Sequence, residues 1–432
     1  MNRLQLFPTS TTIEKTGLAI AGHDLATLAN DHGTPLYLYD RATMDSAVAD
    51  YKSALASHYP KTGSVTYAGK AFLNRAIAQW TQFHELSVDC TGKGEIAMAV
   101  AGGVPREHIL VHGVNKSSAD LESALKHAGT VVVDNLTELK RITAQLALTN
   151  YQLPNLWLRL LPGIAVATHH AHTQTGQQDS KFGMTSAEIM EAAEFCKAND
   201  LPLTGIHFHQ GSNFRDASPL KAAIELGLDL AGEIGFTNEW HFSPGGGWGV
   251  AYHEDELPQP DSNEYVRTIA ENVIDGCKAR GLTLPHLHLE PGRSLVARAG
   301  VAVYKVGVIK RRGDKVWILT DGGMTDNPRY AMYGARYSCL TVSNPGEARS
   351  EKVSIAGPYC ESGDVLIEDL PMPKIEEGDL IAIPASGAYQ LSMSSNYNGS
   401  CKPAVIWLEA DQARVIQRRE TIEDLLRRDQ KI

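Results

Sequence analysis

The fold is decided by SVTYAGK at residues 64–70, where a short apolar β-type run ends in a glycine and a lysine. Similar runs, several followed by polar or glycine-rich residues, recur between residues 36 and 290. They alternate with helical patterns, which indicates βαβ units and a parallel sheet. The other runs are LYLYD (36–40), ILVHG (109–113), TVVVDN (130–135), LWLRLLP (156–162), LTGIHFH (203–209) and LHLEPG (287–292).

About eight strand candidates over roughly 250 residues match a (β/α)8 barrel better than a six-stranded open sheet. One intervening helix is well marked, because Thr185 and Glu188 fit a capping box. The apolar residues that follow it at helical spacing are Ile189, Ala192, Ala193 and Cys196. We therefore predict an α/β chain with a TIM-like barrel, in which motifs directly after strands lie at the active-site end.

The chain has 432 residues, more than one ordinary core contains, so we expect two domains. After residue 296 the pattern changes to β-type runs with hairpin-like turns and little helix, which predicts an antiparallel β domain. The β-like GLAIAG (17–22) would add a strand to it. The expected division is an N-terminal segment joining the β domain (1–35), the barrel (36–295) and the C-terminal β domain (296–432).

Composition excludes several classes of protein. With 43% hydrophobic and 21% charged residues, the chain is typical of a soluble globular protein. The net charge of −10 comes from interspersed acids and bases without a basic block, so nucleic acid is not an expected partner. No apolar run approaches the roughly 18 residues of a membrane span, and we expect a cytoplasmic protein. The six cysteines lack CxxC spacing and are interpreted as free thiols.

Two motifs suggest anion or carbonyl chemistry but have ordinary explanations as well. Lys70 would point into the barrel mouth, yet these residues by themselves favour an ordinary solvated lysine, since an active amine needs a lowered pKa and a carbonyl partner. The glycines 245–247 in SPGGGWGV could turn backbone N–H groups toward a phosphate, or could simply form a tight loop with positive φ. GxGxxG spacing is absent, so a dinucleotide fold gains no support.

The histidines also allow more than one interpretation. His207 and His209 alternate on a predicted strand and would share one face. They could bind a metal, or a ring could stack on an aromatic cofactor while Ser212 reaches a phosphate. The THHAH cluster (168–172) lies among Thr, Gln and Gly, which favours a polar loop over a metal site, and we predict no metal.

A carboxylate and a guanidinium follow another predicted strand, in LHLEPGRS. Glu290 could fix a protonated ring nitrogen, and Arg293 could grip a carboxylate or phosphate with two hydrogen bonds. A mutual salt bridge explains the pair as well.

Six motifs taken in order resemble the fold-type III pyridoxal-phosphate decarboxylases, whose barrel and β domain are alanine racemase-like. They are YAGK (67–70), HFHQGS (207–212), GGGWG (245–249), EPGR (290–293), GPYCESGD (357–364) and GAYQLSMSSNYNG (387–399). Within that group the chain resembles the diaminopimelate decarboxylases, through TGQQDSKFGM (175–184) and DGGMTDNPRYAMYGARY (321–337). The resemblance covers nearly the whole chain and implies decarboxylation of meso-2,6-diaminopimelate to L-lysine and CO2, the last step of lysine biosynthesis.

The resemblance also implies roles for individual residues. Lys70 would hold pyridoxal 5'-phosphate as a Schiff base, and Cys360 would return a proton to the substrate. Other residues implied to bind the cofactor are His209, Ser212, Gly245, Gly246, Gly247, Glu290, Arg293 and Tyr389. Those implied to bind the substrate are Arg293, Arg329, Tyr333, Glu361 and Tyr389. Because Cys360 and Glu361 usually come from the neighbouring subunit, the family implies a homodimer with shared active sites.

Other functions remain open at this point. The chain could decarboxylate ornithine, arginine or carboxynorspermidine, or could be a non-catalytic cofactor-binding regulatory homologue, against which the intact Lys70, Glu290 and Cys360 argue. A racemase fits less well, since the CES and GAY motifs match decarboxylases. The sequence departs from the family pattern at Lys93 in CTGKGE and at Tyr330. Both departures leave the expected chemistry intact, and Tyr330 would affect the fine shape of the specificity pocket.

Overall fold

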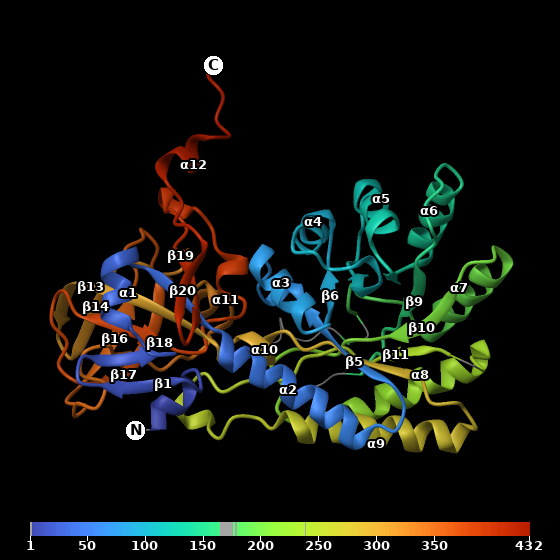
Figure 1. The fold of residues 1–432 in the computed structure, drawn as a ribbon, viewed down its shortest axis with the longest axis horizontal. Helices are drawn as coiled ribbons and strands as arrows, with labels where there is room; N and C mark the ends of the chain where they lie inside the picture. The colour runs from blue at the N-terminus through green and yellow to red at the C-terminus, as the bar shows by residue number, and fades with distance from the viewer. Residues whose placement is uncertain (1, 165–175, 178, 238) are drawn as a thin grey trace. The chain divides into compact units, whose positions relative to one another are not determined.

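The computed structural model describes residues 2–164, 176–177, 179–237 and 239–432 (Figure 1). The chain forms two compact units. The barrel unit comprises residues 48–249 and 261–294, and the β unit comprises residues 1–47, 250–260 and 295–432. Among the described residues, no helix combines the length and the apolar character needed to cross a membrane.

The predicted barrel is confirmed. Eight parallel strands close in the order β10-β11-β12-β5-β6-β7-β8-β9. Their apolar residues are buried, as expected for parallel strands covered by helices. The strands are β5 (Gly63–Ala68), β6 (Ser87–Cys90), β7 (Ile109–Val111), β8 (Thr130–Val133), β9 (Asn155–Arg159), β10 (Leu203–His207), β11 (His241–Ser243) and β12 (His286–Leu289).

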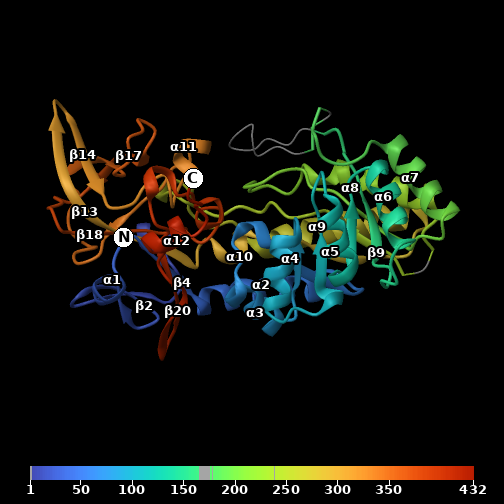
Figure 2. The same cartoon turned by 90° about the horizontal axis from the view of Figure 1, so that it is seen from above.

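Helices surround these strands on the outside (Figures 1 and 2). The predicted capping box is present, with the Thr185 hydroxyl and the Glu188 carboxylate each accepting from the other residue's backbone N–H. The four apolar residues predicted to face the barrel are buried. The helices are α2 (Arg41–His58), α3 (Arg75–Phe83), α4 (Lys93–Ala101), α5 (Ser118–His127), α6 (Leu136–Leu146), α7 (Ser186–Ala198), α8 (Leu220–Ile234) and α9 (Ser262–Arg280).

The β unit contains a nine-stranded, mostly antiparallel sheet in the order β17-β16-β14-β13-β4-β19-β20, with β18 pairing β13 and β15. The strands are β4 (Leu36–Asp40), β13 (Gly300–Arg312), β14 (Lys315–Thr320), β15 (Leu340–Thr341), β16 (Glu351–Ala356), β17 (Val365–Met372), β18 (Leu380–Ile383), β19 (Ala404–Glu409) and β20 (Gln412–Gln417). The remaining helices are α1 (Leu25–His32), α10 (Arg293–Val296), α11 (Arg329–Tyr333) and α12 (Ile422–Leu426).

Two strand assignments differ from the sequence prediction. β4 is not a barrel strand, because it pairs antiparallel with β13 and parallel with β19. All five of its residues are buried, and such a run suits the centre of either sheet. The predicted strand at GLAIAG exists as β2 (Gly17–Ile20), but it pairs with β1 (Thr11–Glu14) and β3 (His23–Asp24) in a separate three-stranded sheet.

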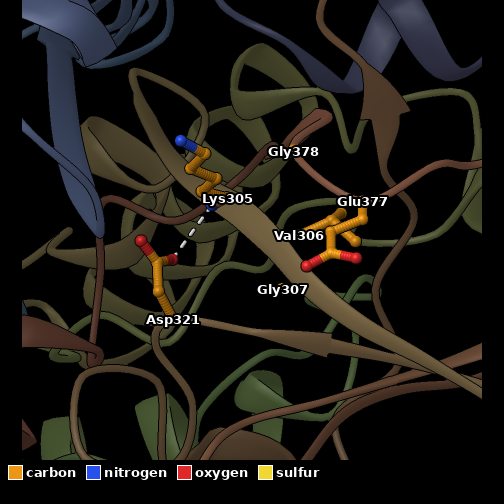
Figure 3. A pocket seen from close by; sticks show the side chains of 6 residues that line it. All are labelled: Lys305, Val306, Gly307, Asp321, Glu377 and Gly378. Atoms are coloured by element: carbon orange, nitrogen blue, oxygen red, sulfur yellow. Dashed lines mark hydrogen bonds between the residues drawn. The ribbon is translucent and has the colours of Figure 1, made fainter.

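A pocket of about 410 Å³ opens beside β13 in the β unit (Figure 3). The backbone N–H of Lys305 donates to Asp321 Oδ1 at 2.9 Å on one side of it. Residues of β13 and of the turn before β18 complete the lining. The lining residues are Lys305, Val306, Gly307, Asp321, Glu377 and Gly378. None of the site residues predicted from the sequence lines this pocket, so it does not define the candidate active site.

Candidate active site

Lys70 lies in a 3₁₀ turn, Gly69–Ala71, that directly follows β5. Its side chain is half-exposed, and Nζ lies 4.0 Å from Oδ2 of Asp89, which is buried at the end of β6. Burial raises the pKa of Asp89 to about 7, the Lys70 ammonium opposes that rise, and the negative charges of Glu290 and Glu95 add to it. The carboxyl ends of these strands therefore hold an amine beside an acid that titrates near neutrality.

Glu290 directly follows β12, and its carboxylate is buried. The Ser243 hydroxyl donates to Oε1 at 2.7 Å, and Nε2 of His207 lies 3.1 Å from Oε2. Burial alone would raise the pKa of Glu290, but the imidazoles of His207 and His112 and these hydrogen bonds hold it well below the usual range. The barrel thus keeps a charged carboxylate in its interior.

His112 and His207 flank this carboxylate at the ends of β7 and β10. The two rings make an edge contact with centroids 4.7 Å apart, and His112 Nε2 lies 3.8 Å from Glu290 Oε1. Burial lowers the pKa of both imidazoles, although the charge of Glu290 opposes this. Neutral His207 can then donate its Nε2–H to Glu290. One ligand atom from each of these three residues lies within 4.8 Å of the others, close enough to hold a metal ion as well.

His209 lies just beyond β10, where its ring is held by the glycine loop. The backbone N–H of Gly246 donates to Nδ1 at 3.4 Å, which leaves the proton on Nε2. Burial first, and then the positive charges of Lys70 and Arg159, lower the pKa of His209 well below its ordinary value. The ring is therefore neutral, and a neutral aromatic face suits stacking against another aromatic ring.

The glycine loop at residues 245–247 packs so closely that side chains do not fit. A Cβ on Gly246 would lie 2.0 Å from the carbonyl oxygen of Glu290. At Gly247, where φ is +106°, a Cβ would lie 2.3 Å from the carbonyl oxygen of Gly211. The loop is thus pressed between the segments that carry Glu290 and Ser212, and it presents backbone groups there without side chains.

Ser212 and Arg293 meet at this end of the barrel. Nη2 of Arg293, which is 7% exposed, donates to the Ser212 hydroxyl at 2.9 Å. A hydroxyl, a guanidinium and glycine N–H groups form the type of donor set that binds phosphate.

In the β unit, Arg329 is the first residue of α11 and is 5% exposed. Nη1 donates to the Tyr337 hydroxyl at 2.6 Å, and Gln390 Nε2 donates to the same oxygen at 2.9 Å. The guanidinium carbon lies 4.3 Å from the centroid of the Tyr252 ring. Among the described residues of the β unit, no carboxylate forms an ion pair with Arg329, which is unusual for a buried cation.

Two further tyrosines predicted to bind ligands lie in the β unit. Tyr333 ends α11 and is half-buried, and Tyr389 takes a left-handed conformation with φ of +59°. The two residues that depart from the family pattern, Tyr330 and Lys93, make local contacts. The Tyr330 hydroxyl donates to Glu368. In the barrel unit, the backbone N–H of Lys93 donates to Asp120 Oδ1 at 3.0 Å.

Cys360 and Glu361 are exposed on the turn between β16 and β17. The backbone N–H of Cys360 donates to Asn398 Oδ1 at 3.1 Å. Asp364 anchors the turn, because its buried carboxylate accepts from the backbone N–H groups of Met324 at 2.7 Å and Tyr359 at 2.8 Å. The thiol is therefore displayed at the surface of this unit by a fixed turn.

The structure brings the barrel residues Lys70, His209, Ser212, Glu290 and Arg293 to the carboxyl ends of the strands, together with the glycine loop. Sequence reasoning missed Asp89, His112 and Ser243, although each lies at or directly after the end of a barrel strand. It named His207 as a candidate residue but did not predict that this histidine contacts Glu290. The THHAH cluster lies outside the described residues.

A barrel that carries a lysine, a buried carboxylate and a glycine loop at its strand ends defines a class of cofactor-dependent enzyme. The family described as pyridoxal-dependent decarboxylase, pyridoxal binding domain, matches residues 41–297, and the chain belongs to it. More particularly, the chain is a member of the diaminopimelate decarboxylase family.

Relatives along the full length support this membership. The diaminopimelate decarboxylase of Bacillus subtilis (strain 168) is 40% identical over 428 residues, covering 95% of each chain. That of Mycobacterium tuberculosis (strain CDC 1551 / Oshkosh) is 36% identical, covering 98% of this chain and 97% of its own. The crystal structure of the M. jannaschii enzyme is 30% identical with a TM-score of 0.90, covers 98% of both chains, and has also been determined with L-lysine.

Proposed function

We propose that this chain uses pyridoxal 5'-phosphate to decarboxylate meso-2,6-diaminopimelate, giving L-lysine and CO2. The observation that carries the substrate assignment is Arg329, a buried guanidinium without a carboxylate partner among the described residues of the β unit. Diaminopimelate retains a second carboxylate at its far end, whereas ornithine, arginine and lysine do not. Only diaminopimelate could therefore form a bidentate arginine–carboxylate pair with Arg329 through its distal carboxylate.

The barrel residues fit the cofactor. The close contacts of Gly246 and Gly247 leave room for backbone only, and this backbone with Ser212 would hold the phosphate. Tyr389 would add its hydroxyl to this cradle. His209 would stack on the ring, and Glu290 would accept a hydrogen bond from the ring nitrogen and keep it protonated. When bound, the cofactor supplies an electron sink for the pair left by the departing carboxylate.

The chain's own residues then bind and orient the substrate and move the proton. Lys70 would hold the cofactor through its amine. Arg329, Arg293 and Tyr333 bind the distal carboxylate, and Glu361 binds the distal ammonium group. The bond from Cα to the carboxylate carbon breaks, CO2 leaves, and Cys360 returns one proton from Sγ to Cα. A thiol suits this step because its ordinary pKa lies near 8.5.

The function is tested by CO2 release with added pyridoxal phosphate, comparing meso-diaminopimelate with ornithine, arginine and lysine at equal concentration. We expect strong preference for diaminopimelate. Preference for one of the others would overturn the role of Arg329 while leaving the Lys70 chemistry in place. Cofactor binding without CO2 release from any of the four would indicate a non-catalytic protein.

We further propose a homodimer whose partner subunit supplies Cys360 and Glu361, consistent with the exposure of both side chains on their turn. When each variant is expressed by itself, Lys70→Ala and Cys360→Ala should both be nearly inactive. We expect the turnover of Cys360→Ala to be about 100-fold lower than that of the wild type. Co-expression of the two variants should restore roughly a quarter of wild-type activity, since half of the dimers contain one intact site. Activity equal to the mean of the two variants would show that each chain acts alone.

A further inference from the structure

Three histidines gather at the end of the barrel opposite to Lys70 and Glu290. His241 is the first residue of β11, His286 is the first residue of β12, and His288 follows on the same strand. His241 and His286 are paired in register between these parallel strands. One ring nitrogen from each of the three lies within 4.8 Å of the other two. The cluster therefore belongs to the amino ends of the strands and is separate from the candidate active site.

Hydrogen bonds explain only part of this cluster. Nδ1 of His241 lies 2.9 Å from Nε2 of His288, and the Ser64 hydroxyl lies 2.8 Å from Nδ1 of His288. A neutral histidine chain ending on a serine would account for these two contacts. It does not account for His286, whose Nε2 is buried without a hydrogen-bond partner in the described part of the chain. Its ring centroid lies only 4.4 Å from that of His288.

The surroundings hold the rings in place and keep them neutral. Trp157 stacks on His241 with centroids 5.3 Å apart and contacts His288 at 4.6 Å. Gly205 makes room for them, since a Cβ there would lie 2.8 Å from the Trp157 ring and 3.0 Å from Cβ of His241. Burial lowers the pKa of His241 to about 4, with His286 and Lys61 adding to the effect. An uncharged imidazole is the form that ligates metal ions.

We propose that His241, His286 and His288 form a binding site for a divalent transition-metal ion of the zinc type. Imidazole ligands suit zinc, copper, nickel and iron, and three of them leave one position for water. Ser64 would then accept from the Nδ1–H of His288, the outer hydrogen bond that orients a metal-binding histidine. Since barrel enzymes place their chemistry at the other end of the strands, this ion stabilises the barrel and takes no part in decarboxylation.

Metal binding requires the ring nitrogens, which lie within 4.8 Å of one another, to reach tetrahedral spacing. With Zn–N bonds of about 2.0–2.1 Å, a tetrahedral ion holds its nitrogens roughly 3.3 Å apart. The His241–His288 pair, at 2.9 Å, would open by a few tenths of an ångström. His286 is half-buried, so its ring can turn inward toward the other two.

The test uses the holoenzyme, freed of unbound cofactor and titrated with Zn2+ and, for its spectrum, with Co2+. We expect about one ion per chain, a Co2+ spectrum typical of tetrahedral nitrogen ligands, and a rise in Tm with Zn2+. His286→Ala should lose these three effects while retaining decarboxylase activity. Ser64→Ala should weaken zinc affinity roughly 10-fold. His127→Ala, which removes a histidine from the end of α5, is the matched control and should bind zinc like the wild type.

Two results would overturn the proposal. One is a wild-type protein that holds no zinc after dialysis and shows no rise in Tm. The other is His286→Ala binding zinc as tightly as the wild type, which would place the ion elsewhere, for example on His112, His207 and Glu290. If His286→Ala does not fold, Ser64→Ala supplies the same comparison, because an unchanged zinc affinity in that variant also contradicts the site.

Discussion

Replacing Lys70 with alanine is expected to abolish decarboxylation, lowering kcat by at least about 10⁴-fold, and to remove the absorbance band of the covalently held cofactor. The expectation rests on position: the amine lies at the carboxyl end of β5, half-exposed and 4.0 Å from Asp89. Burial raises the pKa of Asp89, and the positive charge of Lys70 beside it opposes that rise. Activity and spectrum are measured on the same preparation.

The matched control is Lys93→Ala, which removes an exposed lysine from the start of α4 in the same unit. Its backbone bond to Asp120 survives the substitution, so its activity and spectrum should match the wild type. Retention of both properties by Lys70→Ala would remove the central claim about the active site. If Lys70→Ala loses both the activity and the absorbance band while its Tm is unchanged, the role of Lys70 is chemical and not structural.

The barrel was predictable because most of its strands are continuous apolar runs. Runs such as Thr130–Val133 are buried throughout, and each is separated from the next by a helix. Strand β6 gave no such signal, because its sequence SVDC contains a serine and an aspartate and so does not form an apolar run. β4 was placed in the wrong sheet because a strand buried on both faces has the same pattern in a barrel and in the middle of another sheet.

The candidate site was predictable only where a residue follows a strand within a distinctive motif. Lys70, the glycine loop and Glu290 were found in this way. Asp89 and Ser243 were not, since their roles depend on neighbours distant in sequence: Ser243 donates to a carboxylate 47 residues away. The resemblance named Arg329, but its burial without an acidic partner in the β unit could be learned only from the structure.

That burial gives Arg329 an energetic reason to select substrates. A guanidinium removed from water needs a compensating partner, and Tyr337 and the Tyr252 ring satisfy it only in part. A carboxylate arriving with the substrate would complete the set with charge-assisted bonds. A substrate without a distal carboxylate would leave the cation buried and unpaired, so in the proposed site Arg329 would both attract diaminopimelate and reject ornithine.

Arg329→Ala should therefore lower kcat/KM for meso-diaminopimelate by about 100- to 1000-fold, with a much smaller effect on ornithine. The ratio between the two substrates is the decisive measurement, because a folding defect lowers both equally. Arg329→Lys keeps the charge but loses the forked geometry, and should recover only part of the ratio. Arg336→Ala, which removes an exposed arginine paired with Asp255, is the control and should leave the ratio unchanged. Equal losses on both substrates in Arg329→Ala would mean that this arginine only supports the β unit.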